Sequence, residues 1–148
     1  MHELHHVGYT YYHPLYSFED LKTTADLLRI IKYSTHLEGL AVYAPFQRRL
    51  AENGLIHKDY AVLANESERL KRVNEFFKLF ETIKGTPNRP VVETDYELLE
   101  RFAGGSRLWY IAGAHMAQII DKKYGRSILV QTIKKGSDTF FKIYEEIR

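Results

Sequence analysis

The sequence predicts an all-α fold: a single domain over residues 1–148, built as an array of about seven helices with short connections. Three observations support this prediction. Apolar residues recur at helical spacing along nearly the whole chain, and no alternating stretch is long enough to indicate a sheet. Glycine, proline and asparagine interrupt the helical pattern at short intervals, as turns between helices do. A chain of 148 residues is also long enough to bury one core.

Stop and start signals divide the N-terminal part into helices. Pro14 ends the first helix, because proline cannot continue the backbone hydrogen bonds. Ser17, with Asp20 three residues later, is typical of a helix N-cap. Asn53 and Gly54 then form a C-terminal stop. The expected helices are residues 2–12, a segment following Ser17 that includes Leu21, Ala25, Leu28 and Ile31, and residues 36–52.

The remaining helices are separated by equally clear breaks. Residues 85–92 contain a glycine and two prolines and form the clearest loop. Gly125 and Gly136 each close a helix, as glycine commonly does. The expected helices are residues 59–84, 94–102, 108–124, 127–135 and 137–148.

Composition excludes several classes of function. The formal net charge is only +2, which gives no strong attraction to nucleic acid, and no apolar run is long enough to span a membrane. The chain has no cysteine, so it has no disulfide, thiolate metal site or cysteine nucleophile. Any metal must be held by His, Asp or Glu, which favours zinc or a similar ion. The N-terminus has no apolar signal region, and the localisation is left unassigned.

The most informative motif is at the start of the chain. His2, Glu3 and His6 fit H-E-x-x-H, in which two histidines four residues apart on a helix reach one zinc ion. Glu3 is then placed to take the proton from the metal-bound water. The plain alternative is a frayed histidine-rich terminus. His5 is a competing ligand, since His2 and His5 also share a helix face, but pairing His2 with His6 gives Glu3 its usual role.

A third ligand is expected downstream, in His36-Leu37-Glu38-Gly39-Leu40-Ala41-Val42-Tyr43. H-E-x-x-H followed by E-G-L-A-x-Y resembles the gluzincin type of zinc metallopeptidase. The resemblance implies that Glu38 completes a His-His-Glu site for Zn²⁺, and that Gly39 and Ala41 let the second helix lie close to the first. Alternatively, Glu38 is a carboxylate near the positive end of a helix. His36 would replace it as a ligand if Glu38 pointed away.

The C-terminal half extends the likeness. The segment from Tyr110 to Ile120, then Gly125-Arg126, then Lys135 to Tyr144 resembles the tail of bacterial predicted zinc-dependent proteases of uncharacterised function. The resemblance implies a peptide or protein substrate and a downstream donor to the tetrahedral oxyanion, for which His115 is the first candidate, with Tyr43 and Tyr110 as rivals. A lone histidine on an apolar helix face is more often a core residue. Arg107 is expected either to bind a substrate carboxylate or to form a structural ion pair.

Gluzincins carry a sheet before the motif helix, and this sequence has no residues there. We therefore expect a chain equivalent to the active-site helix and helical C-terminal subdomain of a zincin, N-terminally truncated, with Met1 an internal residue of a longer protease. Exposed aromatic residues of the first helix would then favour self-association. The prediction is a zinc-dependent peptidase, inactive or weak in this short form. The alternative is a non-catalytic helical interaction or metal-binding module derived from a protease.

Overall fold

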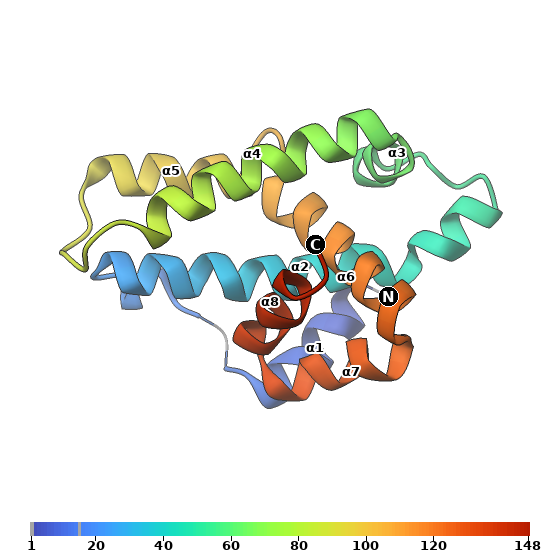
Figure 1. Ribbon diagram of the computed structural model, residues 1–148, viewed down its shortest axis with the longest axis horizontal. Coiled ribbons are helices and arrows are strands. Elements are labelled where there is room, and N and C mark those ends of the chain that lie inside the picture. The colour runs from blue at the N-terminus through green and yellow to red at the C-terminus, as the bar shows by residue number, and fades with distance from the viewer. Residues whose placement is uncertain (1, 15) are drawn as a thin grey trace.

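The computed structural model describes residues 2–14 and 16–148, with the side chains of residues 2–4 left out of the description. The all-α prediction is confirmed: these residues form eight α-helices, one short 3₁₀ turn and no strand (Figure 1). The elements are α1 (His2–Tyr12), η1 (Phe18–Asp20), α2 (Thr24–Ala51), α3 (Lys58–Ala64), α4 (Glu66–Lys84), α5 (Glu93–Ala103), α6 (Leu108–Tyr124), α7 (Arg126–Lys135) and α8 (Ser137–Glu145).

Helix α2 is longer than the sequence pattern predicted. Two expected segments are joined into one helix of 28 residues that has no break before residue 36. Its start is fixed by a capping box, in which the Asp26 amide donates to the Thr23 hydroxyl and the Asp26 carboxylate accepts from the Thr23 amide. Ser17 caps only the short 3₁₀ turn. The break was predicted wrongly because a buried helix is apolar on several faces, which hides its continuity.

The expected helix over residues 59–84 is two helices, α3 and α4. Asn65 divides them in an extended conformation, with φ −92° and ψ 108°. Its side-chain oxygen accepts a hydrogen bond from the Glu68 amide and so caps α4. Asparagine offers the backbone this local alternative to a helical hydrogen bond, so it interrupts an otherwise continuous apolar pattern.

Helix α6 crosses α2 at the centre of the molecule, and two glycines face each other at the crossing. A Cβ atom on Gly39 would overlap the backbone of Gly113, and one on Gly113 would overlap the Thr35 carbonyl oxygen. The two backbones can approach this closely only because both positions lack a side chain. The expectation that Gly39 brings the second helix close to the first is therefore wrong, since Gly39 faces α6.

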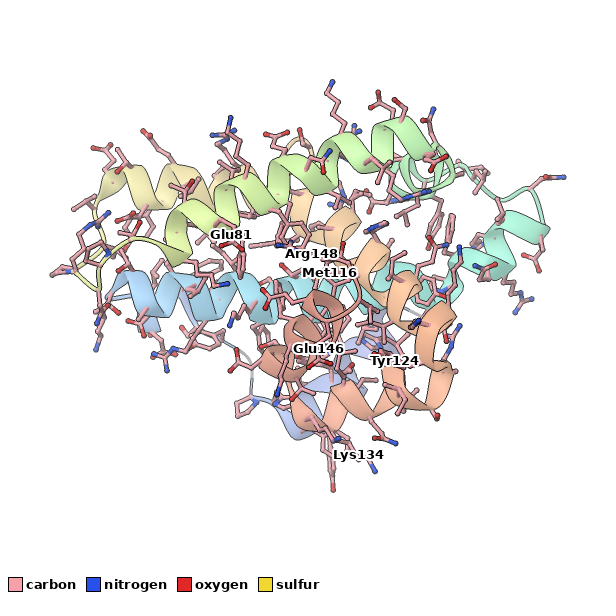
Figure 2. The ribbon with its side chains drawn as sticks, in the orientation of Figure 1. Glu81, Met116, Tyr124, Lys134, Glu146 and Arg148 are labelled. Atoms are coloured by element: carbon pink, nitrogen blue, oxygen red, sulfur yellow. The ribbon has the colours of Figure 1, made fainter. Side chains whose placement is uncertain are left out.

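The other helices form two layers on either side of α2: α3, α4 and α5 on one side, and α1, α7 and α8 on the other (Figure 1). Met116 of α6 is fully buried at the centre, whereas Lys134 of α7 projects from the edge of the molecule (Figure 2). Among the aromatic residues of α1, Tyr9 is buried, but Tyr11 is 82% exposed. The part of the chain that the structure describes contains no helix long and apolar enough to cross a membrane.

Candidate metal centre

Tyr9 fixes the position of α1 on α2. Its ring packs edge-on against Tyr33, with 5.4 Å between the ring centroids. Its hydroxyl is 2.9 Å from Nδ1 of His36, inside the core. The residue three positions before a buried helical side chain, here His6, lies on a neighbouring part of the same face. This contact therefore sets which residues of the N-terminal turns of α1 face α2.

His36 is a core residue that joins three helices. The Thr132 hydroxyl donates to the Leu129 carbonyl, so it must accept from Nε2 of His36, 3.0 Å away. Nδ1 of His36 is then the acceptor for the Tyr9 hydroxyl. Burial also lowers the pKa of His36 well below its usual value, which keeps the ring neutral. With both ring nitrogens bonded, His36 is not the substitute metal ligand that the sequence allowed.

His6 and Glu38 meet at the junction of α1 and α2. Nε2 of His6 lies 3.2 Å from Oε2 of Glu38, although the residues are 32 positions apart in the sequence. The two side chains are 24% and 17% exposed, so the pair is partly buried and still reachable from solvent. The structure thus brings together two of the three side chains predicted to bind a metal, one from each helix.

The separation of these two atoms is compatible with a shared ion. Two ligands of tetrahedral Zn²⁺, each about 2.0–2.1 Å from the metal, lie roughly 3.3 Å from each other. The observed distance of 3.2 Å is close to this value. It equally fits a direct hydrogen bond or ion pair between imidazole and carboxylate. The donor set, one imidazole and one carboxylate, is the kind that zinc accepts.

The other two motif residues, His2 and Glu3, belong to α1, but their side chains lie outside the described part of the structure. Residues 2 and 6 occupy successive turns of α1, so the backbone keeps the one-turn spacing that the motif requires. No cluster of three His, Asp or Glu side chains suited to a metal occurs among the described residues. The side chains of His2 and Glu3 are not among these residues.

His5 faces a different neighbour from His6. Its ring lies 6.2 Å from that of Tyr9, and it borders a small cavity of about 120 Å³ with Leu129, Val130 and Ile133 of α7. Adjacent residues of a helix point about 100° apart. The same cavity is also lined by Leu40 and Tyr43, so His5 lies between α2 and α7.

The candidate oxyanion donors occupy separate places. Gly113 faces α2, and a residue two positions later projects from the opposite side of a helix, so His115 points away from α2. Its ring lies 6.2 Å from that of Tyr144. The Tyr43 hydroxyl donates to Asp121 at 2.7 Å, and burial, followed by this bond, raises the pKa of Tyr43 to about 12. The Tyr110 ring lies beneath the guanidinium of Arg107.

Tyr33 is a neighbour of the candidate centre that the sequence did not suggest. Its hydroxyl is buried and has no hydrogen-bond partner among the described residues. Burial raises the pKa of Tyr33, and the negative charge of Glu38 raises it further. Tyr33 and Glu38 are five positions apart on α2, a spacing that does not place two side chains on one face, so no helical pattern indicated their proximity.

His115 should make the stability of the protein depend on pH. Burial, and to a smaller extent Arg69 and Lys122, lowers the pKa of His115 from 6.5 to about 4. Between these values the unfolded chain binds a proton that the folded chain does not, so the free energy of unfolding falls as the pH falls. The lowered pKa of this imidazole alone should reduce the free energy of unfolding by roughly 2 kcal/mol between pH 7 and pH 5.

Urea unfolding of the wild type and of His115→Leu at both pH values measures this contribution. The variant should lose less stability on acidification than the wild type, by roughly 2 kcal/mol. Equal losses in the two proteins would show that the buried ring is not the group responsible. His36, whose pKa is also lowered by burial, acts in the same direction in both proteins and cancels from the comparison.

The fold and the His6–Glu38 pair define an all-α protein with imidazole and carboxylate donors meeting where its first two long helices join, an arrangement suited to metal binding. The chain belongs to the family described as "Putative zinc dependent peptidase (DUF5700)", whose family model matches residues 1–147. No curated protein and no solved structure matches the chain.

Proposed function

We propose that this protein is a zinc-dependent peptidase of the gluzincin type, in which His2, His6 and Glu38 hold Zn²⁺ and Glu3 is the general base. The observation that carries the proposal is the 3.2 Å approach of His6 to Glu38 between two helices. The description of the family, which names zinc and peptidase activity, supports it. The spacing of His2, Glu3 and His6 within α1 supports it further.

The proposed reaction is hydrolysis of a peptide bond in a peptide or protein substrate. Zn²⁺ held by His2, His6 and Glu38 would lower the pKa of a water to about 7 and so make hydroxide available at neutral pH. The Glu3 carboxylate would accept a proton from the water that attacks the carbonyl carbon, and would deliver it to the amine nitrogen as the peptide C–N bond breaks. The partial exposure of His6 and Glu38 leaves their position open to a substrate.

The donor to the developing oxyanion stays a prediction among His115, Tyr43 and Tyr110. His115 is the first candidate from the family resemblance, and its position on the far side of α6 requires a rearrangement before it could act. Tyr43 is on α2, as Glu38 is, and its high pKa keeps the hydroxyl protonated, as a hydrogen-bond donor must be. Hydrolysis rates of His115→Gln and Tyr43→Phe would distinguish these two.

A second function is supported by the same contact. A hydrogen bond between His6 and Glu38 holds α1 against α2 without any metal, so the fold is compatible with a non-catalytic interaction or metal-binding module. In that case zinc is absent from the protein, or is bound without hydrolysis. The two functions therefore make different predictions for metal content and for peptidase activity.

Replacing Glu38 with Ala is expected to remove bound zinc. The wild type, purified and equilibrated with Zn²⁺, should carry about one ion per chain, and the variant much less than one, because two imidazoles alone bind zinc weakly. Elemental analysis after gel filtration measures this ratio. The matched control is Glu52→Ala, an exposed carboxylate paired with Arg48 just beyond the end of the same helix, which should keep the wild-type zinc content. Equal zinc in Glu38→Ala and the wild type would exclude Glu38 as a ligand.

A further inference from the structure

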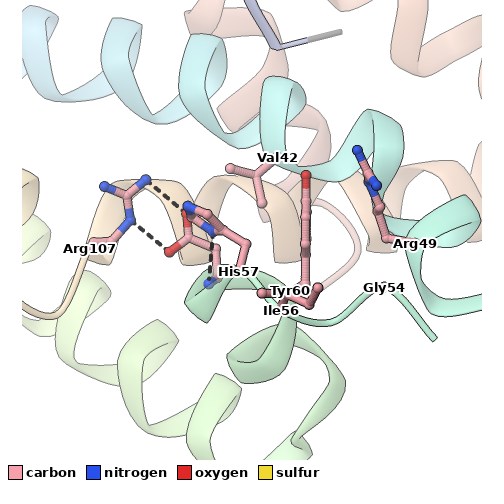
Figure 3. A pocket seen from close by; sticks show the side chains of 8 residues that line it. Val42, Arg49, Gly54, Ile56, His57, Tyr60 and Arg107 are labelled. Carbon is pink, nitrogen blue, oxygen red and sulfur yellow. Dashed lines mark hydrogen bonds and ion pairs between the residues drawn. The ribbon is translucent and has the colours of Figure 1, made fainter.

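An open cavity lies on α2, beyond Glu38 toward the C-terminal end of that helix. It has a volume of about 570 Å³, within the range of small-molecule sites. The C-terminal half of α2, the loop before α3, the start of α3 and Arg107 enclose it (Figure 3). Its lining residues are Val42, Arg49, Gly54, Ile56, His57, Asp59, Tyr60 and Arg107.

One cation of this cavity is already neutralised. Nε and Nη2 of Arg107 donate to the two oxygens of buried Asp59, at 2.6 and 2.8 Å (Figure 3). The same guanidinium lies 3.6 Å from the ring centre of Tyr110. The sequence allowed two roles for Arg107, binding a substrate carboxylate or forming a structural ion pair. The structure shows the ion pair. It is also held at φ +52°, an uncommon conformation for a non-glycine residue that is often retained at functional sites.

A second cation in the cavity has no such partner. Arg49 forms no ion pair with any residue in the described ranges, 2–14 and 16–148, although its charge adds a little to the lowering of the Glu52 pKa that Arg48 mainly causes. Its neighbour Arg48 is paired with Glu52 at 2.8 Å. The hydroxyl of Tyr60 points toward α2, between Val42 and Arg49 (Figure 3). Arg49 and Tyr60 both line this cavity, and a guanidinium and a hydroxyl are both donors to a carboxylate.

Part of the wall is apolar. Val42, on the α2 side of the cavity, is buried. The ring of Tyr60 stacks on Phe46, with 6.2 Å between the ring centroids. Ile56, at the rim, is 97% exposed, which is unusual for a large aliphatic side chain. An apolar ligand seated here would cover Ile56 and remove it from water.

We infer that this cavity binds the carboxylate of an apolar acid, with Arg49 and Tyr60 receiving the charged end and Val42 and Ile56 contacting the aliphatic part. Counting Arg49, Arg107 and Asp59, the cavity carries one net positive charge, which matches a single carboxylate. His57, exposed beside Asp59, is within the same wall.

The position of the cavity indicates one source of such an acid. Val42 follows Glu38 by one helical turn, so the two lie on the same face of α2, about 6 Å apart along the axis. A peptide in contact with Glu38 could therefore place its C-terminal residue in the cavity. This assignment to a peptide rests on the proposed function, whereas recognition of the carboxylate does not.

The test is a calorimetric or NMR titration of the full chain with a zinc chelator present. N-acetyl-leucine should bind roughly tenfold more tightly than N-acetyl-leucinamide, because the amide has no charge to pair with the guanidinium. Arg49→Gln should lose roughly the same tenfold, and Tyr60→Phe a smaller factor. Arg48→Gln is the matched control, one residue away and paired with Glu52, and should bind like the wild type. Equal binding of acid and amide, or equal losses in the two arginine variants, would overturn the inference.

Two further ligands separate the sources of the carboxylate. Tighter binding of N-acetyl-Ala-Ala-Leu than of 4-methylpentanoate identifies a peptide C-terminus, and equal binding identifies a small aliphatic acid. Either result supports recognition of a carboxylate. If neither ligand binds, the inference is contradicted. Because no metal is present, a negative result here leaves the zinc proposal standing, and a protein without zinc can still pass this test.

Discussion

Glu3→Gln is expected to reduce peptide hydrolysis at least about 100-fold while leaving the zinc content of the protein unchanged. Glutamine keeps the size of the side chain but cannot accept a proton, so the general-base step is lost. His6 and Glu38, which are 3.2 Å apart, are not altered by the change. Hydrolysis of a fluorescent unfolded protein and zinc content are measured on the same preparations of the variant and the wild type.

The control for this experiment is Glu19→Gln, an exposed carboxylate in the 3₁₀ turn that follows α1. It should hydrolyse the substrate at the wild-type rate. A Glu3→Gln protein that retained full activity would exclude Glu3 as the base. A wild type that binds zinc and hydrolyses nothing would favour the non-catalytic metal-binding function instead.

Gly113→Ala is expected to destabilise the fold by about 3 kcal/mol or more, because the added methyl group would overlap the Thr35 carbonyl oxygen. This neighbour is backbone within a 28-residue helix and cannot move aside as a flexible side chain would. The helices α2 and α6 would have to separate along the centre of the core. Urea unfolding monitored by circular dichroism measures the loss.

Gly8→Ala provides the matched control, because Gly8 is also helical and a Cβ there meets nothing within 4 Å. Alanine is the better helix former, so this variant should gain up to about 1 kcal/mol. Similar losses in both variants would show that the α2–α6 crossing is not the reason that glycine is required at position 113. A Gly113→Ala protein as stable as the wild type would show that the two helices can part without cost.

Much of the fold could be predicted because its signals are local. The bounds of α1 and α6 agree with the predicted ranges, since proline, glycine and an uninterrupted apolar pattern mark their ends. The predicted helix bounds were wrong where a side-chain hydrogen bond determined where a helix begins. Thr23 with Asp26, and Asn65, form capping hydrogen bonds that the spacing of apolar residues does not reveal.

The candidate site was predictable only as a set of residue types. The sequence could place His2 and His6 one turn apart, and it suggested Glu38 by resemblance. It could not distinguish among the seven histidines by environment. His36 is two positions from Glu38, yet it is fully buried and bonded to Tyr9 and Thr132. Neighbouring residues of a helix point in different directions, and only packing decides which direction is the core.

The sequence by itself determined the all-α class, most of the helix boundaries, and the restriction of any metal ligands to His, Asp and Glu, since each depends on composition or on residues a few positions apart. The tertiary structure decided that His6 meets Glu38, that Gly39 serves the α6 crossing, and that Arg49 faces a cavity while Arg107 is paired. These contacts join distant parts of the chain. They depend on how whole helices pack, and no short segment contains that information.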